Sequence, residues 1–404
     1  MNHKNTESNK SGLASTQSGK SLKAIIRITD RCNQDCSYCY VDRETRRSSK
    51  VKLSLQSLSH LYSEILSGQH FNHVHIIWHG GEPTLVGHEY LDAAISLQLK
   101  YLGEGVEVNN SIQTNTTALD DRMLEVFKKH SVGVGISLDA PPDVHNKMRV
   151  SWSGHSTLER VLSQIETMRS HGLKFGAICV LHKQNYKRCD EIYDFFKAVG
   201  LNYQFNPFYR DEATPLSTTD ELCITPEQYA EALIQTFNRY ISDPSPTISV
   251  TDLKEIVLSM FMGCSRSCLF AGKCEEFIGI LPTGEIYLCD MFYREDFRVG
   301  NIDSITAKSI IDSAAVKVIQ TRPTVLQQTY CKGCEWWNIC RGGCSSKSAA
   351  VYGDALREDP FCLSRKELFA HIRSSMNKLG GKEVIQHART SRDDSLRISP
   401  CGTI

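Results

Sequence analysis

Short apolar runs alternate with amphipathic segments over the first half of the chain. Most of these runs are rich in Ile and Val and end in polar residues or Gly, which is typical of buried strands. The segments between them repeat apolar residues at helical spacing. The pattern predicts strands at Ala24–Thr29, His73–Trp78, Val106–Thr114, Val132–Leu138, Phe175–Leu181 and Tyr203–Pro207, and helices that include Leu53–Leu66, Leu158–Met168 and Ile192–Val199.

Alternating strands and helices favour an α/β fold in which a parallel sheet has its helices outside. We expect a partial (β/α)6 TIM-like barrel over residues 23–245, with its chemistry at the carboxyl ends of the strands. A further helix is predicted at Pro226–Ile241, and the Pro-rich Asp243–Pro246 after it marks the expected domain boundary. Residues 1–22 are expected to be a disordered tail, and residues 367–404 the end of a helix and a polar tail in which Cys401 is incidental.

Composition narrows the class of protein. The 404 residues include 46 Lys and Arg and 46 Asp and Glu, so the formal net charge is zero. No basic field favours a nucleic acid partner, and no apolar run approaches a membrane span. The N-terminal stretch lacks an apolar signal core, so we expect a cytoplasmic protein. In that compartment the 16 cysteines favour metal or cluster binding over disulfides.

The first cysteine motif is Cys32-x3-Cys36-x2-Cys39, directly after the first predicted strand. Three thiolates can hold a 4Fe–4S cube and leave its fourth iron without a protein ligand. A zinc knuckle and buried thiols are the alternatives, but zinc takes four ligands and no fourth Cys or His stands close by. With Tyr38 before the last cysteine, the motif resembles that of the radical S-adenosylmethionine (SAM) enzymes. The resemblance implies that the open iron chelates SAM and that reduction cleaves SAM to a 5′-deoxyadenosyl radical.

The string His79-Gly80-Gly81-Glu82-Pro83 follows the second predicted strand and resembles the GGEP motif of the same enzymes. A carboxylate suits the SAM ammonium, and two glycines let the backbone approach a ligand closely. Turn or helix-capping roles remain open for Asn115 and Asp139, which stand at the ends of predicted strands, and a surface ion pair remains open for Arg149. The resemblance implies a SAM site made of Tyr38, Gly80, Gly81, Glu82, Asn115, Ser137, Asp139 and Arg149.

The C-terminal half carries a second group of cysteines, which resembles the SPASM domain of peptide-modifying radical SAM enzymes and is expected within residues 246–366. Its order and spacing are similar to those of the anaerobic sulfatase-maturating enzymes. Two zinc ribbons or a disulfide framework are the alternatives, and disulfides are disfavoured because nothing in the sequence suggests secretion. The resemblance implies two auxiliary 4Fe–4S clusters, and so three clusters in all, one held by Cys268, Cys274, Cys289 and Cys344 and the other by Cys331, Cys334, Cys340 and Cys362.

Asp290 directly follows Cys289, and in the sulfatase-maturating enzymes the aspartate at this place is assigned as the base. Removal of hydrogen and then an electron from a carbon must be matched by loss of a proton, which a carboxylate can accept. The sequence also departs from that family. His79 stands where its members carry Gln, Ala140 where they carry Gly, and Val41 where an aromatic is usual. These changes surround the expected substrate.

We therefore expect a radical SAM oxidoreductase that takes a side-chain hydrogen from a ribosomal precursor peptide and forms a cyclophane-type crosslink. Formylglycine formation on a sulfatase Cys or Ser is the alternative, followed by dehydrogenation or epimerisation of a small molecule. A non-catalytic electron carrier is disfavoured by the open three-cysteine site. The expected electron donor is a flavodoxin or ferredoxin. The tail before Ala24 is too short for a separate leader-binding domain, so a leader would dock on the barrel or SPASM surface.

Overall fold

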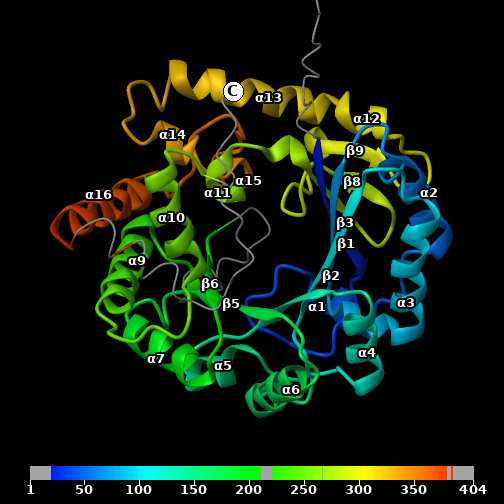
Figure 1. The fold of residues 1–404 in the computed structure, drawn as a ribbon, viewed down its shortest axis with the longest axis horizontal. Helices are drawn as coiled ribbons and strands as arrows, with labels where there is room; N and C mark the ends of the chain where they lie inside the picture. The colour runs from blue at the N-terminus through cyan, green and yellow to red at the C-terminus, as the bar shows by residue number, and fades with distance from the viewer. Residues whose placement is uncertain (1–19, 211–220, 266, 380–383, 385–404) are drawn as a thin grey trace, which may run out of the picture.

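The computed structural model describes residues 20–210, 221–265, 267–379 and 384. Its centre is a nine-stranded sheet in the order β6-β5-β4-β3-β2-β1-β7-β8-β9. Neighbouring strands from β6 to β7 are parallel, and β7, β8 and β9 pair antiparallel. The helices form a ring around the sheet, as Figure 1 shows. The expected partial barrel with helices outside is confirmed.

The strand bounds agree closely with those predicted for the first half of the chain. The barrel strands are β1 (Ser21–Thr29), β2 (His73–Gly80), β3 (Glu107–Thr114), β4 (Gly133–Ser137), β5 (Phe175–Leu181) and β6 (Tyr203–Pro207). Three short strands that the sequence did not indicate extend the sheet: β7 (Phe277–Ile280), β8 (Glu285–Tyr287) and β9 (Arg298–Asn301).

The helices of the barrel lie between its strands. They are α1 (Arg43–Ser48), α2 (Leu55–Ile65), α3 (His88–Ser96), α4 (Asp121–Lys129), α5 (Pro142–Met148), α6 (Leu158–Ser170), α7 (Cys189–Val199) and α9 (Pro226–Ile241). The C-terminal half adds α10 (Thr251–Met262), α11 (Cys268–Ala271), α12 (Ala307–Ile311), α13 (Ala314–Gln328), α14 (Trp337–Cys340), α15 (Ser345–Tyr352) and α16 (Cys362–Leu379).

Alternation along the strands separates the core from the inner face of the barrel. On β1, Ala24, Ile26 and Ile28 are fully buried, in one hydrophobic cluster with Leu58 and Leu61 of α2. Successive strand residues point to opposite faces, so the other β1 side chains turn toward the inside of the barrel. Arg27 is one of these. A charged side chain is thereby placed inside the barrel, near its functional edge.

The expected boundary at Asp243–Pro246 does not divide the hydrophobic core. Asp243 is 3% exposed and pairs with Lys197 of α7 at 2.6 Å, so this stretch is fastened to the barrel. Beyond it, β7 pairs directly with β1, and one buried cluster contains apolar residues from both halves. The expected N-terminal tail also ends earlier than predicted, since β1 begins at Ser21.

The remainder of both tails, including Cys401, lies outside the described residues. Among the helices that the structure describes, none combines the length and apolar character needed to cross a membrane.

Candidate functional site

The sheet brings the predicted site residues to one edge. Cys32 follows β1, Glu82 follows β2, Asn115 follows β3 and Asp139 follows β4, and these four strands are parallel neighbours. Carboxyl ends of parallel strands meet at the same edge of a barrel, which is where such folds place their chemistry. The placement that alternation predicted is therefore present in the structure.

The two glycines after β2 bring two backbone segments into contact. Gly81 N–H donates to the Thr29 carbonyl at 2.8 Å, and Glu82 N–H donates to the Arg31 carbonyl at 2.8 Å. A Cβ on Gly80 would lie 2.1 Å from the Thr29 oxygen, and one on Gly81 would lie 2.2 Å from the Asp30 oxygen. Only glycine fits at this approach. These residues therefore hold the loop after β2 against the segment that leads into Cys32.

Glu82 is fully buried, and its carboxylate accepts hydrogen bonds from the protein. Oε1 accepts from the Thr84 and Thr114 hydroxyls, both at 2.7 Å, and Oε2 accepts from Asn115 N–H at 2.7 Å. Burial raises the pKa of Glu82, and these hydrogen bonds oppose that rise. The geometry makes Glu82 a brace between the ends of β2 and β3. Direct contact with the SAM ammonium stays a prediction.

Buried Arg46 on α1 fixes the three-cysteine loop. It is 4% exposed and donates to the carbonyls of Val41 and Gln34, each at 3.0 Å. Cys32 N–H donates to the Arg46 carbonyl at 2.8 Å, and the Trp152 indole donates to the Cys32 carbonyl at 2.9 Å. The loop is therefore held from both sides by backbone contacts that leave its thiols for another ligand.

The three cysteines of this loop are half-buried. Burial raises the pKa of Cys32 to about 12, and the neighbouring charges of Glu82, Cys36 and Cys39 add to the rise. Burial likewise raises the pKa of Cys36 to about 11, with Cys39 contributing. An iron–sulfur cluster holds its ligands as thiolates, so it would offset the cost of burying three ionisable thiols together. The donor set thus fits a cluster. Asn115 Nδ2 lies 3.8 Å from the Cys32 sulfur.

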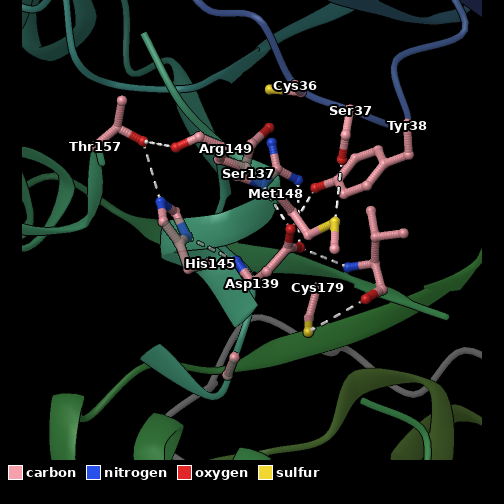
Figure 2. Close-up of polar contacts among 12 residues, drawn as sticks. Cys36, Ser37, Tyr38, Ser137, Asp139, His145, Met148, Arg149, Thr157 and Cys179 are labelled. Atoms are coloured by element: carbon pink, nitrogen blue, oxygen red, sulfur yellow. Dashed lines mark hydrogen bonds and ion pairs between the residues drawn. The ribbon is translucent and has the colours of Figure 1, made fainter. Parts of the chain in front are cut away.

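Asp139 is the centre of a buried polar network beside this loop (Figure 2). It accepts from Arg149 Nε at 2.9 Å, from Val180 N–H at 2.9 Å and from the Tyr38 hydroxyl. Desolvation would raise the pKa of Asp139, but Arg149 and its other partners outweigh that effect and lower it. The alternative of a surface ion pair at Arg149 is wrong, because its pair with Asp139 is buried. Arg149 gives Nε and Nη2 to Asp139, so a contact with the SAM carboxylate, which stays a prediction, would use Nη1.

Two further residues complete this network. The Ser137 hydroxyl accepts from Gln113 Nε2 at 2.9 Å. His145 accepts from Asp139 N–H at 3.2 Å through Nδ1, and its Nε2 lies 3.2 Å from the Thr157 hydroxyl. Burial lowers the pKa of His145 to about 4. His145 is therefore neutral near pH 7, and it orients Asp139 through the backbone.

The eight C-terminal cysteines influence one another's pKa within each of the two sets that the resemblance implied, and their assignment to two clusters stays a prediction. In the first set, Cys344 raises the pKa of Cys268, Cys274 and Cys289, after burial as the main cause. In the second set, burial raises the pKa of Cys331 to about 11, and Cys340, Cys362 and Cys334 add to the rise. These mutual effects support the two proposed sets, whose members come from several segments of the sequence.

The spacing of these side chains bears on the kind of metal. Within the described ranges, no three His, Cys, Asp or Glu side chains lie close enough to hold a single metal ion. Each thiol of a cubane binds a different iron, so its ligands stand further apart than the ligands of one zinc. The kind of metal that these cysteines bind stays a prediction.

Asp290 lies between the C-terminal cysteines and the end of β2. It belongs to a group of polar side chains that the sequence only partly indicated. Its Oδ1 is 3.3 Å from the Cys289 sulfur. On the other side, Asp290 raises the pKa of the His79 imidazole, although burial, the larger effect, lowers it. Asp290 also contributes to the raised pKa of Tyr40 and Tyr293, for both of which burial is the main cause.

Arg27 belongs to the same group and was missed from the sequence. It is the register partner of His79 across β1 and β2. Its guanidinium lies 5.2 Å from the Tyr293 ring centroid and 5.7 Å from that of Tyr40, and it pairs with Asp30. Its one sequence signal is a charged residue inside an apolar strand. Three buried atoms here lack a hydrogen-bond partner within the described residues: Arg27 Nε, His79 Nδ1 and the Tyr293 hydroxyl.

Comparison with known families divides the chain in the same way. Residues 26–196 match the Radical SAM superfamily, and residues 268–335 match the SPASM family, described as an iron–sulfur cluster-binding domain. The chain is 26% identical over 364 residues to a cysteine-type anaerobic sulfatase-maturating enzyme of Clostridium novyi, covering 87% of this chain and 95% of that protein. It is 26% identical over 395 residues to a serine-type anaerobic sulfatase-maturating enzyme of Bacteroides thetaiotaomicron, covering 91% and 94%.

Solved structures share the fold. The structure of anSMEcpe with bound AdoMet superposes with a TM-score of 0.76 at 23% identity, covering 89% of this chain and 99% of that one. Streptococcus suis SuiB bound to its precursor peptide SuiA gives a TM-score of 0.62 at 15% identity, covering 85% and 76%. The chain thus carries a radical SAM domain in residues 26–196 and a SPASM iron–sulfur cluster-binding domain in residues 268–335.

Proposed function

We propose that the protein is a radical SAM maturase that oxidises a side chain of a peptide or protein by two electrons. The position of Asp290 carries the proposal. It touches the Cys289 thiol on one side and interacts with His79, at the end of β2, on the other. A substrate group at the strand ends would therefore have an acceptor for a proton on the side of the auxiliary cysteines.

The overall change balances without a further oxidant. The substrate loses a hydrogen atom, then one electron and one proton, and so becomes oxidised by two electrons. When bound, SAM and the clusters supply the hydrogen acceptor and the one-electron steps. The carboxylate of Asp290 takes the proton, which is general base catalysis by a positioned group. In this proposal Cys32, Cys36 and Cys39 hold the cluster that binds SAM, and the other eight cysteines hold two auxiliary clusters.

The product we propose is a crosslink from a side-chain carbon to a neighbouring ring or side chain of the same peptide. The supporting observation is the group around Asp290. His79 stands where the sulfatase-maturating enzymes carry Gln, and here it lies beside Arg27, which itself lies over the Tyr293 ring. Within the described residues, each of these three side chains has a buried atom without a hydrogen-bond partner. A site changed in this way indicates a changed substrate. The similarity to cysteine-type and serine-type sulfatase-maturating enzymes makes formylglycine formation the second candidate.

Mass spectrometry of the reacted peptide separates the two. The anaerobically reconstituted protein is incubated with SAM, a strong reductant and either a precursor peptide encoded beside its gene or a sulfatase-derived Cys or Ser peptide. We expect loss of two hydrogens from the precursor peptide, without reactivity toward a hydrazide. A crosslink also joins two fragments that otherwise separate in tandem spectra. A hydrazide-reactive aldehyde on the sulfatase peptide, with no change in the precursor, would select formylglycine formation.

A further inference from the structure

Arg322, on α13, is a buried cation between the two sets of C-terminal cysteines. It is 3% exposed. Its Nε donates to the Ala355 carbonyl at 2.8 Å, and Nη1 donates to the Gly343 carbonyl at 3.0 Å. Its Nη2 donates to the carbonyls of Gly342 at 2.9 Å and Arg357 at 2.8 Å. The guanidinium is thus surrounded by neutral carbonyl groups.

These contacts fix the turn that joins the two sets. The turn runs from Cys340, in the second set, to Cys344, in the first. Gly342 and Gly343 both have positive φ, at 80° and 74°. A Cβ on Gly343 would lie 1.7 Å from Arg365 Nη1, so a side chain is excluded there. The shape of this turn sets where one ligand of each set stands, and Arg322 holds it.

The charge of Arg322 has no carboxylate partner within ion-pair distance in the part of the chain that the structure describes. The neighbouring Arg365 differs, since it pairs with buried Asp359 at 2.6 Å. Burying a charge without a counter-charge costs several kcal/mol. Arginine cannot avoid that cost by losing its proton. A buried anion is therefore expected near Arg322.

The cysteines are the groups that can supply that anion. Burial lowers the pKa of Arg322, and the nearby Cys274 and Cys344 oppose that effect more strongly than Asp359 does. Burial raises the pKa of Cys274 and Cys331, one thiol from each set, and Arg322 opposes that rise at both. A cluster with four thiolates carries a net negative charge, and a fixed cation beside it stabilises the reduced form. Because Arg322 lies near thiols of both sets, its charge is placed to stabilise the reduced form of both clusters.

We propose that Arg322 is the positioning and charge-compensating residue of the paired auxiliary clusters, and that it raises their reduction potentials. This inference rests on the proposed assignment of two auxiliary clusters. A raised reduction potential favours transfer of an electron from the substrate to these clusters. It also predicts that the two potentials respond together to a change at this one residue.

The test compares Arg322→Met, Arg322→Lys and Lys366→Met in the full chain. Methionine keeps an unbranched apolar stem without the charge, whereas lysine keeps the charge without the fork of donors. Lys366 is an exposed cation near Cys362, and its field is screened by water. Iron per chain and the midpoint potentials of the auxiliary clusters, from redox titration followed by electron paramagnetic resonance, are the readouts.

We expect Arg322→Met to shift both auxiliary potentials to more negative values, while Arg322→Lys stays nearer to wild type and Lys366→Met does not shift. If Arg322→Met fails to retain auxiliary iron, retention by Arg322→Lys supports the proposal equally. Wild-type potentials in Arg322→Met would overturn it. So would equal loss of iron in both Arg322 variants, or an equal shift in Lys366→Met. Wild-type protein that takes up only about four irons would instead remove the paired clusters themselves.

Discussion

The N-terminal and C-terminal cysteine regions each contain a buried arginine, but they are built in opposite ways. Cys32, Cys36 and Cys39 come from one loop after one strand, and the nearby buried arginine, Arg149, is neutralised by Asp139 at 2.9 Å. The other eight cysteines come from segments between residues 268 and 362, and their buried Arg322 has only carbonyl partners within the described residues. A local motif can reveal the first kind of site, whereas only the tertiary fold assembles the second.

The difference suits two roles in one reaction. We assign hydrogen abstraction to the first region and removal of the electron and proton to the second. Asp290, at Cys289 and near His79, lies where the two meet. Variants that damage one region and spare the other are the way to break this division.

The largest expected effect is at the N-terminal thiols. Replacing Cys32, Cys36 and Cys39 by Ala should remove about one third of roughly twelve irons per chain, because each cubane holds four. SAM cleavage to 5′-deoxyadenosine should be abolished, while the auxiliary signals in electron paramagnetic resonance remain. Iron analysis and chromatography of the reaction measure both. Loss of all iron would show that the two regions do not assemble independently.

Asp139→Asn tests the paired charges of the first region. The change leaves the Arg149 guanidinium buried without its anion, which typically costs about 3–5 kcal/mol. A large fall in Tm is expected. Asp143→Asn is the matched control, because the Asp143–Arg188 pair is exposed and such pairs contribute only about 0–1 kcal/mol. Equal Tm values for the two variants would contradict the importance of the buried pair.

The pH dependence of stability provides a smaller effect in the same network. The pKa of His145 is lowered to about 4 from an ordinary 6.5, so the unfolded chain binds a proton that the folded chain does not. The stability that neutral His145 contributes to the folded state is fully present above pH 6.5 and is lost as the pH falls toward 4. By linkage, about 1.4 kcal/mol per pKa unit gives roughly 3 kcal/mol over that window.

His145→Gln should therefore flatten the decline of Tm between pH 7.5 and 5, measured by calorimetry. His155→Gln, at an exposed histidine, is the control and should keep the wild-type slope. A slope unchanged in His145→Gln would place the acid sensitivity elsewhere.

Glu82→Ala is expected to act specifically on SAM binding, with a loss of stability from the groups that it leaves unpaired. It leaves the Thr114 hydroxyl and Asn115 N–H without their acceptor, at about 1–3 kcal/mol for each buried group. Because these groups hold the ends of β2 and β3, SAM affinity should fall while iron content stays unchanged. Equilibrium binding of SAM measures this. Wild-type affinity would remove Glu82 from the site, both as a brace and as a ligand.

Much of the barrel could be predicted, because most of its strands, such as β1, β2 and β5, carry apolar runs that stand out from their surroundings. The strands β7 to β9 could not. β8 spans only Glu285–Tyr287, and its pairing is long-range. No local pattern of three residues distinguishes a strand from a turn.

The candidate site divides along the same line. The cysteines and strand ends were found from motifs. The partners that fix them were missed, since Arg27 meets His79 only through strand register, and Arg322 meets Gly342 only through the fold. The internal hydrogen bonds of Glu82 also show why a motif carboxylate can brace a loop where ligand contact was expected.

The most direct test of the division between the two regions is Asp290→Asn with a deuterated substrate peptide. The variant keeps the size of the side chain and loses its basicity. We predict wild-type transfer of deuterium into 5′-deoxyadenosine, together with a fall in oxidised peptide of about 10²–10⁴-fold. Both are measured in one reaction by mass spectrometry. Oxidised peptide at the wild-type rate, or loss of deuterium transfer together with product, would contradict the assignment of Asp290 to the second step.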